Sequence, residues 1–153
     1  MDRYFTTVPY VIDTLINKTR TWFPEFVVSD GRPNRQEEIA PDLVCIGYTG
    51  IDGEEAVTNR REREQLTNSP ERETYEITNI VSSWHGENSD AAYVRNVCYT
   101  FLDQMNMYLM KDQTLDGLVM RIRLISDDMA ADLTPKGAIC TVRFLFRVDA
   151  YTR

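Results

Sequence analysis

Histidine and cysteine are scarce in this sequence. One histidine, His85, and three cysteines, Cys45, Cys98 and Cys140, occur among 153 residues. A single histidine excludes a two-histidine mechanism and a histidine-rich metal site within one chain. The cysteines are widely spaced and odd in number, which excludes a Cys-x-x-Cys metal motif and a complete disulfide framework. We therefore interpret them as buried free thiols and predict no metal and no cofactor.

Long apolar runs and an excess of basic residues are also missing. No stretch of the sequence approaches the roughly 20 consecutive apolar residues that a membrane-spanning helix needs. Residues 1–5 lack the basic and apolar segments that begin a secretion signal, so we expect a cytoplasmic location and no membrane partner. The 17 basic and 24 acidic residues give a net charge of −7. That is the wrong sign for a protein that binds nucleic acid over its whole surface.

Two segments have the periodicity of amphipathic helices. The chain length fits one domain, residues 1–153, with a single hydrophobic core. Apolar side chains recur every three or four residues over 8–23, where Thr6 or Thr7 would cap the first turn. A second and longer helix, of about six turns, is predicted over 89–109 from the same spacing.

Other segments have the composition or the two-residue period of strands. We expect extended chain at 25–29, 43–46, 74–84, 118–125 and 138–150. The last of these alternates between two faces, and one face is apolar: Cys140, Val142, Phe144, Phe146 and Val148. The last two strands are predicted to form an antiparallel hairpin with an extended tip.

Two polar segments interrupt this pattern. Residues 50–73 carry many charges of both signs and few large aliphatic side chains, so we expect a solvated loop or a short charged helix. The alternative is an arm that becomes ordered against a partner. Residues 126–138 are predicted to be the solvated tip of the hairpin, because Asp127, Asp128 and Asp132 lack the spacing of a calcium loop.

Four arginines alternate with apolar residues in the two strands of the hairpin. Arg121 and Arg123 lie on the first strand, and Arg143 and Arg147 lie on the second. Like charges on neighbouring strands repel unless carboxylates, phosphates or a second subunit screen them. Long side chains extending into water are one interpretation, and an interface with a subunit or partner is the other. These four arginines are our candidate interface residues.

No motif of catalysis or of cofactor binding is present. Gly47, Gly50 and Gly53 have three-residue spacing and no following Lys-Ser or Lys-Thr, so they match neither a phosphate loop nor a dinucleotide-binding fingerprint. His85 has no sequence motif that would supply a nucleophile and an orienting group. We predict no catalytic residues and no enzyme activity.

Several short motifs follow one another along the chain. They are Ile80-Val81-Ser82-Ser83-Trp84-His85-Gly86, the helix from Ser89, Leu115-Asp116-Gly117-Leu118-Val119, Ser126, Gly137, the closing Val142-Arg143-Phe144-Leu145-Phe146-Arg147-Val148-Asp149-Ala150, and Arg153. In order and spacing they resemble the tail terminator proteins of long-tailed bacteriophages. The Asp30-Gly31-Arg32-Pro33 turn and the Leu43-Val44-Cys45-Ile46-Gly47 strand fit the same layout, so the resemblance spans most of the chain.

The resemblance implies an α+β fold with a mixed, mostly antiparallel sheet flanked by two main helices. It implies a homohexameric ring on the head-proximal end of the phage tail tube, which stops tube growth and forms the head-tail joining surface. Its partners would be the tail tube protein and a head-closure or connector protein. Genomic DNA would pass through the lumen without specific binding. The protein would be assembled in the host cytoplasm and reside in the tail or neck of the virion.

Two other classes remain open. Another neck component, such as a head-closure or adaptor subunit, would share the size, acidity and lack of chemistry. A small cytoplasmic enzyme is the more distant alternative, and it would need a pocket with a perturbed titrating group, most plausibly around His85.

If the arginines meet neighbouring subunits, charge reversal at Arg143 should weaken ring assembly and leave the fold intact. Light scattering over a wide concentration range would measure the mass of the assembly, which for a hexamer is about 107 kDa, six times 17.8 kDa. Circular dichroism would report the fold. Unchanged assembly would contradict the assignment of Arg143.

Overall fold

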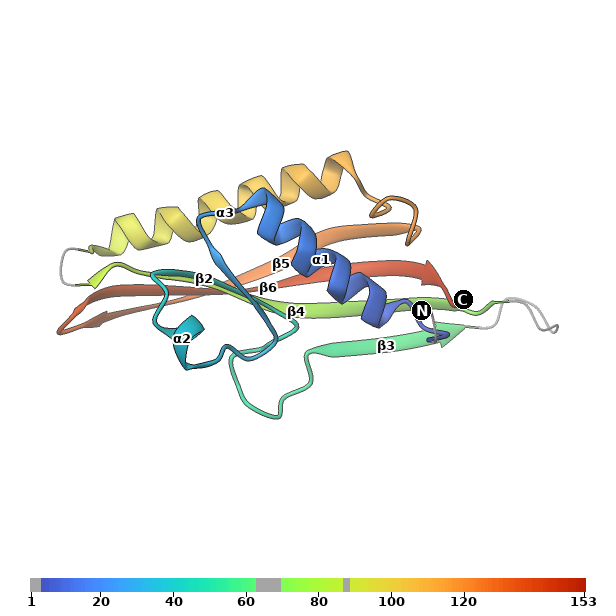
Figure 1. Cartoon of the computed structure of the whole chain (residues 1–153), viewed down its shortest axis with the longest axis horizontal. Coiled ribbons are helices and arrows are strands. Elements are labelled where there is room, and N and C mark those ends of the chain that lie inside the picture. The colour runs from blue at the N-terminus through green and yellow to red at the C-terminus, as the bar shows by residue number, and fades with distance from the viewer. Residues whose placement is uncertain (1–3, 63–69, 87–88) are drawn as a thin grey trace.

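A six-stranded mixed sheet is the framework of the molecule (Figure 1). The computed structural model describes residues 4–62, 70–86 and 89–153. The elements are α1 (Val8–Trp22), β1 (Val27–Asp30), α2 (Arg35–Glu38), β2 (Asp42–Ile46), β3 (Val57–Glu62), β4 (Arg72–Trp84), α3 (Ala91–Lys111), β5 (Arg121–Thr134) and β6 (Gly137–Tyr151). The fold is α+β, as the resemblance implied.

Strand β4 organises the sheet. On one side β4 pairs with β6 along its full length, Arg72–Trp84 against Tyr151–Ile139. On the other side β2 and β3 follow each other along the same edge of β4, and β1 adds to β2 in parallel. The sheet order is therefore β1-β2-β4-β6-β5, with β3 beside β4, and every pairing except β1–β2 is antiparallel.

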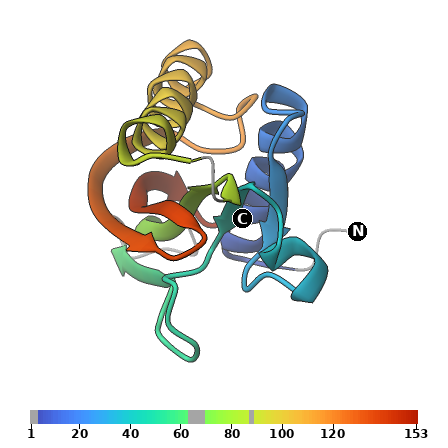
Figure 2. The ribbon, with the colours of Figure 1, turned by 90° about the vertical axis from the view of Figure 1, so that its left-hand side faces the viewer.

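Helices α1 and α3 cover one face of the sheet (Figures 1 and 2). Under them lies the main hydrophobic cluster, which draws side chains from both helices and from β1, β2, β4, β5 and β6. The five alternating residues predicted for the apolar face of the last strand are all completely buried there. Where the two helices meet, the Trp22 and Tyr108 rings stack at 4.5 Å.

Both predicted helices are confirmed. Helix α3 begins after Asp90, whose carboxylate accepts a hydrogen bond from the Tyr93 amide at 2.7 Å. Thr7 occupies the N-cap position of α1, but its hydroxyl does not cap the helix. Strands were predicted near β1, β2, β4, β5 and β6, and these are confirmed. The short helix α2, which Asn34 and Glu37 close with a capping box, was not predicted.

Strand replaces part of the first predicted loop and nearly all of the second. Within 50–73, residues Val57–Glu62 form β3, because their backbone groups complete the free edge of β4, and 72–73 begin β4, whereas 50–56 are turn and loop, as predicted. Residues 63–69 lie outside the described residues. Within 126–138, β5 continues to Thr134 and β6 starts at Gly137, since the two strands pair with each other up to that turn. The polar composition of these segments correctly indicated exposure to solvent. It did not distinguish an exposed strand from an exposed loop.

A buried carboxylate joins the start of α1 to β3 and β4. Glu73, on the helix-covered face of β4, is fully buried. It accepts hydrogen bonds from the Thr7 amide at 2.8 Å, from both threonine hydroxyls, Thr6 and Thr7, at 2.7 Å, and from Asn59 Nδ2 at 2.9 Å. Burial raises the pKa of Glu73, but these hydrogen bonds outweigh it, so the net pKa of this carboxyl is lowered.

Glu73→Gln should destabilise the fold by about 1–3 kcal/mol at pH 7, because an amide cannot accept this set of donors and leaves some unsatisfied. The carboxylate's contribution is present above its unfolded pKa and is lost as the pH falls through its lower folded pKa. The difference from wild type in urea unfolding should therefore shrink in acid. Glu25→Gln, at an exposed carboxylate outside the sheet, is the matched control. A pH-independent difference would contradict this account.

Candidate interaction face

The sheet face opposite α1 and α3, here called the outer face, is the candidate functional site. A smaller cluster of Leu43, Cys45 and Ile80, with Tyr48 against it, lies there beside α2 and the loop 47–56. Beyond this cluster the alternate residues of β4, β5 and β6 are polar, charged or half-buried rather than covered by a second layer. A sheet with one open face usually presents it to water or to a partner.

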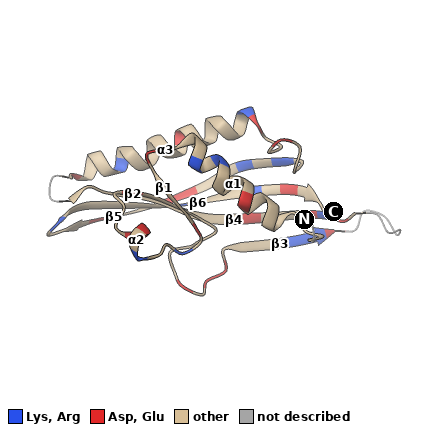
Figure 3. Ribbon diagram, in the orientation of Figure 1, with Lys and Arg blue, Asp and Glu red and all other residues tan. Residues whose placement is uncertain are grey.

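Arginines gather at one end of the outer face. Five side chains from three strands line a single depression, here called the basic cleft: Arg60, Glu62, Arg72, Thr74 and Arg147. The Nε atom of Arg147 is buried without a hydrogen-bond partner. Among described residues, no carboxylate lies within 4 Å of a guanidinium of the cleft. Figure 3 shows the basic parts of β3 and β5 toward the end of the sheet that carries the C-terminus.

The four predicted interface arginines do not form one group. Arg121, Arg123 and Arg147 lie on the outer face close to the basic cleft, where Arg123 and Arg147 are direct cross-strand partners and Arg121 is opposite Asp149. Like charges directly opposite each other on antiparallel strands are destabilising. The Arg123–Arg147 pair therefore does not stabilise the fold of the single chain.

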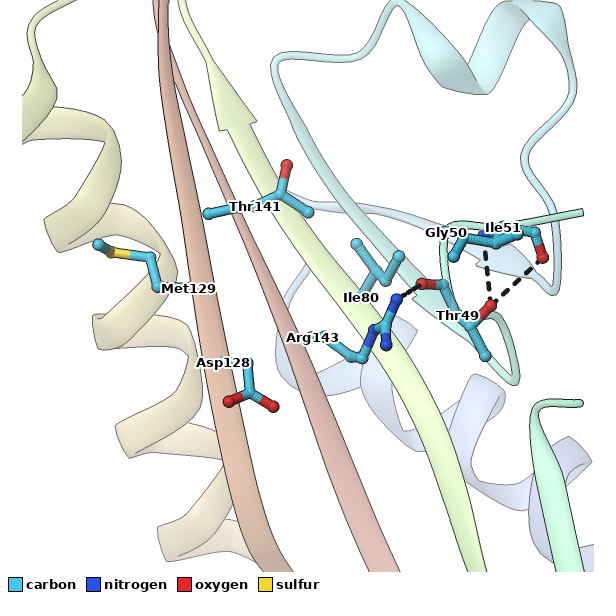
Figure 4. Close-up of a pocket in the computed structure, with 9 residues that line it drawn as sticks. Thr49, Gly50, Ile51, Ile80, Asp128, Met129, Thr141 and Arg143 are labelled. Carbon is cyan, nitrogen blue, oxygen red and sulfur yellow. Dashed lines mark hydrogen bonds between the residues drawn. The ribbon is translucent and has the colours of Figure 1, made fainter. Parts of the chain in front are cut away.

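Arg143 lies apart from the other three arginines, nearer the hairpin tip. Its guanidinium donates a hydrogen bond to the Thr49 carbonyl oxygen at 2.9 Å (Figure 4). It also lies 3.9 Å from a Glu54 carboxylate oxygen. Asp128 is its cross-strand partner on β5. Arg143 thus anchors the loop 47–56, and its role at an interface stays a prediction. Reversing its charge would also release that loop.

His85 has structural partners. Its Nε2 lies 2.8 Å from Asp42 Oδ1, which also accepts the Ser83 hydroxyl at 2.8 Å, and its ring packs edge-on against Tyr93. The carboxylate therefore lies between the serine and the histidine, so it does not orient the imidazole toward a serine nucleophile. This arrangement fixes the end of β4 to the start of β2.

The cysteines are buried, as predicted. Burial and, less strongly, nearby Glu37 raise the pKa of the Cys45 thiol to about 12. Burial is also the main cause of a raised pKa at Cys98, whose Sγ lies 3.6 Å from the Cys140 carbonyl oxygen. A raised pKa keeps a thiol protonated and unreactive. The described residues contain no group of three or more histidine, cysteine or acidic side chains that could hold a metal, and none of their helices is long and apolar enough to cross a membrane.

Motifs of the resemblance meet at the tip of the hairpin, beside the start of α3. Ser89 donates its hydroxyl hydrogen toward the Gly86 carbonyl at 2.8 Å and the Ala138 carbonyl at 3.0 Å. Gly137 has a φ of 115°, and a Cβ added there would lie 1.8 Å from the Gly86 carbonyl oxygen. Only glycine fits this contact. These residues set the backbone path between β4, α3 and β6.

The Leu115-Asp116-Gly117 turn joins α3 to β5 through left-handed backbone. Leu115 and Asp116 have φ values of 48° and 58°, which non-glycine residues seldom adopt. Lys18 of α1 holds the turn through Asp116, 2.8 Å away, and Asp112, 3.4 Å away. Leu115 is buried, so packing compensates for the backbone strain.

Sequence reasoning missed Arg60 and Arg72. Both lie within the segment that was interpreted as a loop, and their opposite-sign neighbours made the local charge look balanced. Once 57–62 is known to be a strand, the two-residue period puts Arg60 and Glu62 on the outer face and Arg61 on the other. The alternation Val57, Asn59, Arg61 against Thr58, Arg60, Glu62 was the signal that could have found this.

The likeness of the chain to known proteins is structural and distant. No protein-family model matches the chain, and no curated protein matches it. Among solved structures, the chain is similar to a chain of the virion of a native gene transfer agent particle, at 12% identity and a TM-score of 0.41, covering 92% of this chain and 91% of that chain. At this level of similarity, function has to be argued from the residues themselves.

Arg123→Glu should stabilise the isolated chain by about 0.2–1 kcal/mol, because it replaces a repulsive cross-strand pair with an attractive one. Urea unfolding at a concentration where the chain is monomeric would measure this. Arg121→Glu is the matched control: it brings a second carboxylate opposite Asp149 and should lower stability. If Arg123→Glu were as destabilising as the control, the Arg123–Arg147 repulsion would be refuted.

Proposed function

We propose that the chain is a structural protein of a phage-like virion, a tail terminator that forms a ring on the head-proximal end of the tail tube. In this role it stops tube polymerisation and forms the surface that joins tail to head. The ring would be a homohexamer, assembled in the host cytoplasm, with the tube protein and a head-closure or connector protein as its partners. DNA would pass through its lumen without specific binding.

The sequence resemblance supports this assignment, together with the position of its motifs. The resemblance implies an α+β fold with a mixed sheet flanked by two helices, and this is the fold observed. Its most constrained positions, Gly137 and the Leu115–Gly117 turn, have backbone conformations or contacts that restrict the residue type. The shared motifs therefore have a structural meaning in this chain.

The observation that carries the proposal is the open outer face, where the arginines of the basic cleft outnumber its carboxylates. A ring subunit needs surfaces that match its neighbours, and it needs no active site. Contacts between unlike surfaces form a ring when the rotation between copies closes. The described residues supply charged surfaces suited to such contacts, whereas His85 and the cysteines are held in structural contacts.

A second neck component, a head-closure or adaptor subunit, remains the alternative. Such a subunit would bind the portal side of the connector and would not affect tube length. The acidity of the chain fits both roles, because a terminator and a head-closure subunit would each surround the DNA as it passes. A negatively charged channel wall does not bind the DNA phosphates. The length of the tail tube distinguishes a terminator from a head-closure or adaptor subunit.

Adding the purified protein to tail tube protein during polymerisation should stop elongation and give shorter tubes as its concentration rises. Electron microscopy would measure the length distribution and show a ring at one tube end. Virions produced without the protein should carry overlong or unstable tails. Normal-length tails detached from heads would instead favour the head-closure alternative and contradict a terminator.

A further inference from the structure

We infer that the basic cleft of one copy binds the acidic outer half of the β5–β6 hairpin of a second copy. This acidic hairpin is defined by Asp128 and Asp132, which lie on the outer face of β5. The inference rests on the proposed function, because it names the surfaces through which the ring would close. It assigns the cleft a carboxylate-bearing strand as its ligand.

The basic cleft holds more arginines than carboxylates. Glu62 is the cross-strand partner of Arg72 and Glu76 that of Arg147, but among the described residues no ion pair joins them within 4 Å. Arg60, Arg72 and Arg147 come from three adjacent strands, so the sheet holds their backbones at fixed spacing. Arg123 faces Arg147 and adds further positive charge. Guanidinium groups bind carboxylates through paired, charge-assisted hydrogen bonds. An anionic partner would relieve the repulsion that the isolated chain carries.

The acidic hairpin has the complementary charge, and its one cross-strand cation is Arg143, opposite Asp128. In the described part of the chain no lysine or arginine nitrogen lies within 4 Å of Asp128 or Asp132. Both aspartates are exposed. On the other face of the same strand, 45% of Met129 and 79% of Leu133 are exposed. Exposed apolar side chains on an edge strand are typical of a protein contact rather than of a solvated tip.

The two surfaces cannot satisfy each other within one molecule. Asp132 is opposite Ile139, eight residues along β6 from Arg147. At about 3.3 Å per residue, Asp132 is about 26 Å from Arg147, and Asp128, opposite Arg143, is four residues or about 13 Å from Arg147; both separations exceed the screening length of about 8 Å at physiological salt. The surfaces also lie toward opposite ends of the sheet (Figures 1 and 3). Contact between them is therefore intermolecular and joins unlike ends.

A second copy fits these observations better than DNA does. A nucleic-acid site would use the arginines alone and would leave the acidic hairpin unexplained. Docking between copies accounts for both surfaces with one contact. Because each copy has one cleft and one hairpin, successive contacts run head to tail, and such contacts close into a ring or continue as a filament.

Paired charge reversals test the contact. The first variant is Arg60→Glu with Arg147→Glu, and the second is Asp128→Lys with Asp132→Lys. Sedimentation velocity should show that the protein concentration needed for assembly is at least about tenfold higher for each variant than for wild type. A chain with all four reversals should assemble again, because its two altered surfaces are once more complementary.

The matched control reverses two exposed carboxylates elsewhere, Glu25→Lys with Asp103→Lys, and changes the net charge as much as the aspartate variant does. It should assemble like wild type. Circular dichroism of every variant shows whether it is folded. Assembly unaffected by both reversals, or no recovery in the fourfold variant, would overturn the inference.

Cross-linking tests the same contact if the ring closes only on a tube end. Arg147→Lys introduces an amine that a carbodiimide can couple directly to a carboxylate. With tubes present, mixed isotopically light and heavy chains should give intermolecular cross-links from position 147 to Asp128 or Asp132. Cross-links only within one chain, or only to other carboxylates, would overturn the docking.

Two outcomes separate this inference from the proposed function. Wild-type rings that cap tubes and survive both reversals would support the terminator and overturn the docking. Reversal-sensitive assemblies limited to two copies would support the docking and contradict a ring. Duplex DNA supplies a last control. DNA binding that the arginine reversals abolish, combined with assembly that the aspartate reversals leave intact, would make the cleft a nucleic-acid site and overturn the inference.

Discussion

The continuous pairing of β4 with β6 is the constraint on which the rest of the structure depends. Thirteen register positions, from Arg72–Tyr151 to Trp84–Ile139, are paired without interruption. Every other strand except β1 pairs directly with one of these two, and both helices pack on the face that they create. Because side chains alternate across this ladder, one register decides both the buried face and the charged face.

The two faces of the sheet differ in how their polar and charged groups are partnered. On the helix-covered face, the fully buried Glu73 carboxylate accepts four hydrogen bonds, although Thr19 Oγ1 and Asn59 Oδ1 are buried there without a partner. On the outer face, an excess of arginines and a pair of aspartates occur at separate places, and among the described residues no ion pair within 4 Å neutralises the cleft arginines or Asp128 and Asp132. This separation of charge is the basis of the proposal that the outer face takes part in assembly.

Much of the fold could be predicted from the sequence, because periodicity reports burial directly. The stripe of α3 and the alternation of Cys140 to Val148 each have one apolar face, and both were identified correctly. Strand β3 and the outer half of β5 were not, since neither buries an apolar face and their order comes from backbone pairing with a neighbour. Local sequence does not encode that kind of stability.

The candidate site was predicted only in part, for the same reason. Arg121, Arg123 and Arg147 follow from the alternation within the hairpin, but Arg60 and Arg72 depend on the pairing of β3 with β4. Arg143 was grouped with them because spacing along a strand does not reveal the Thr49 contact. The uninterrupted ladder has one more consequence if copies join end to end. A stiff sheet then sets the distance between successive joints, so the length of two strands would fix the bore of the channel.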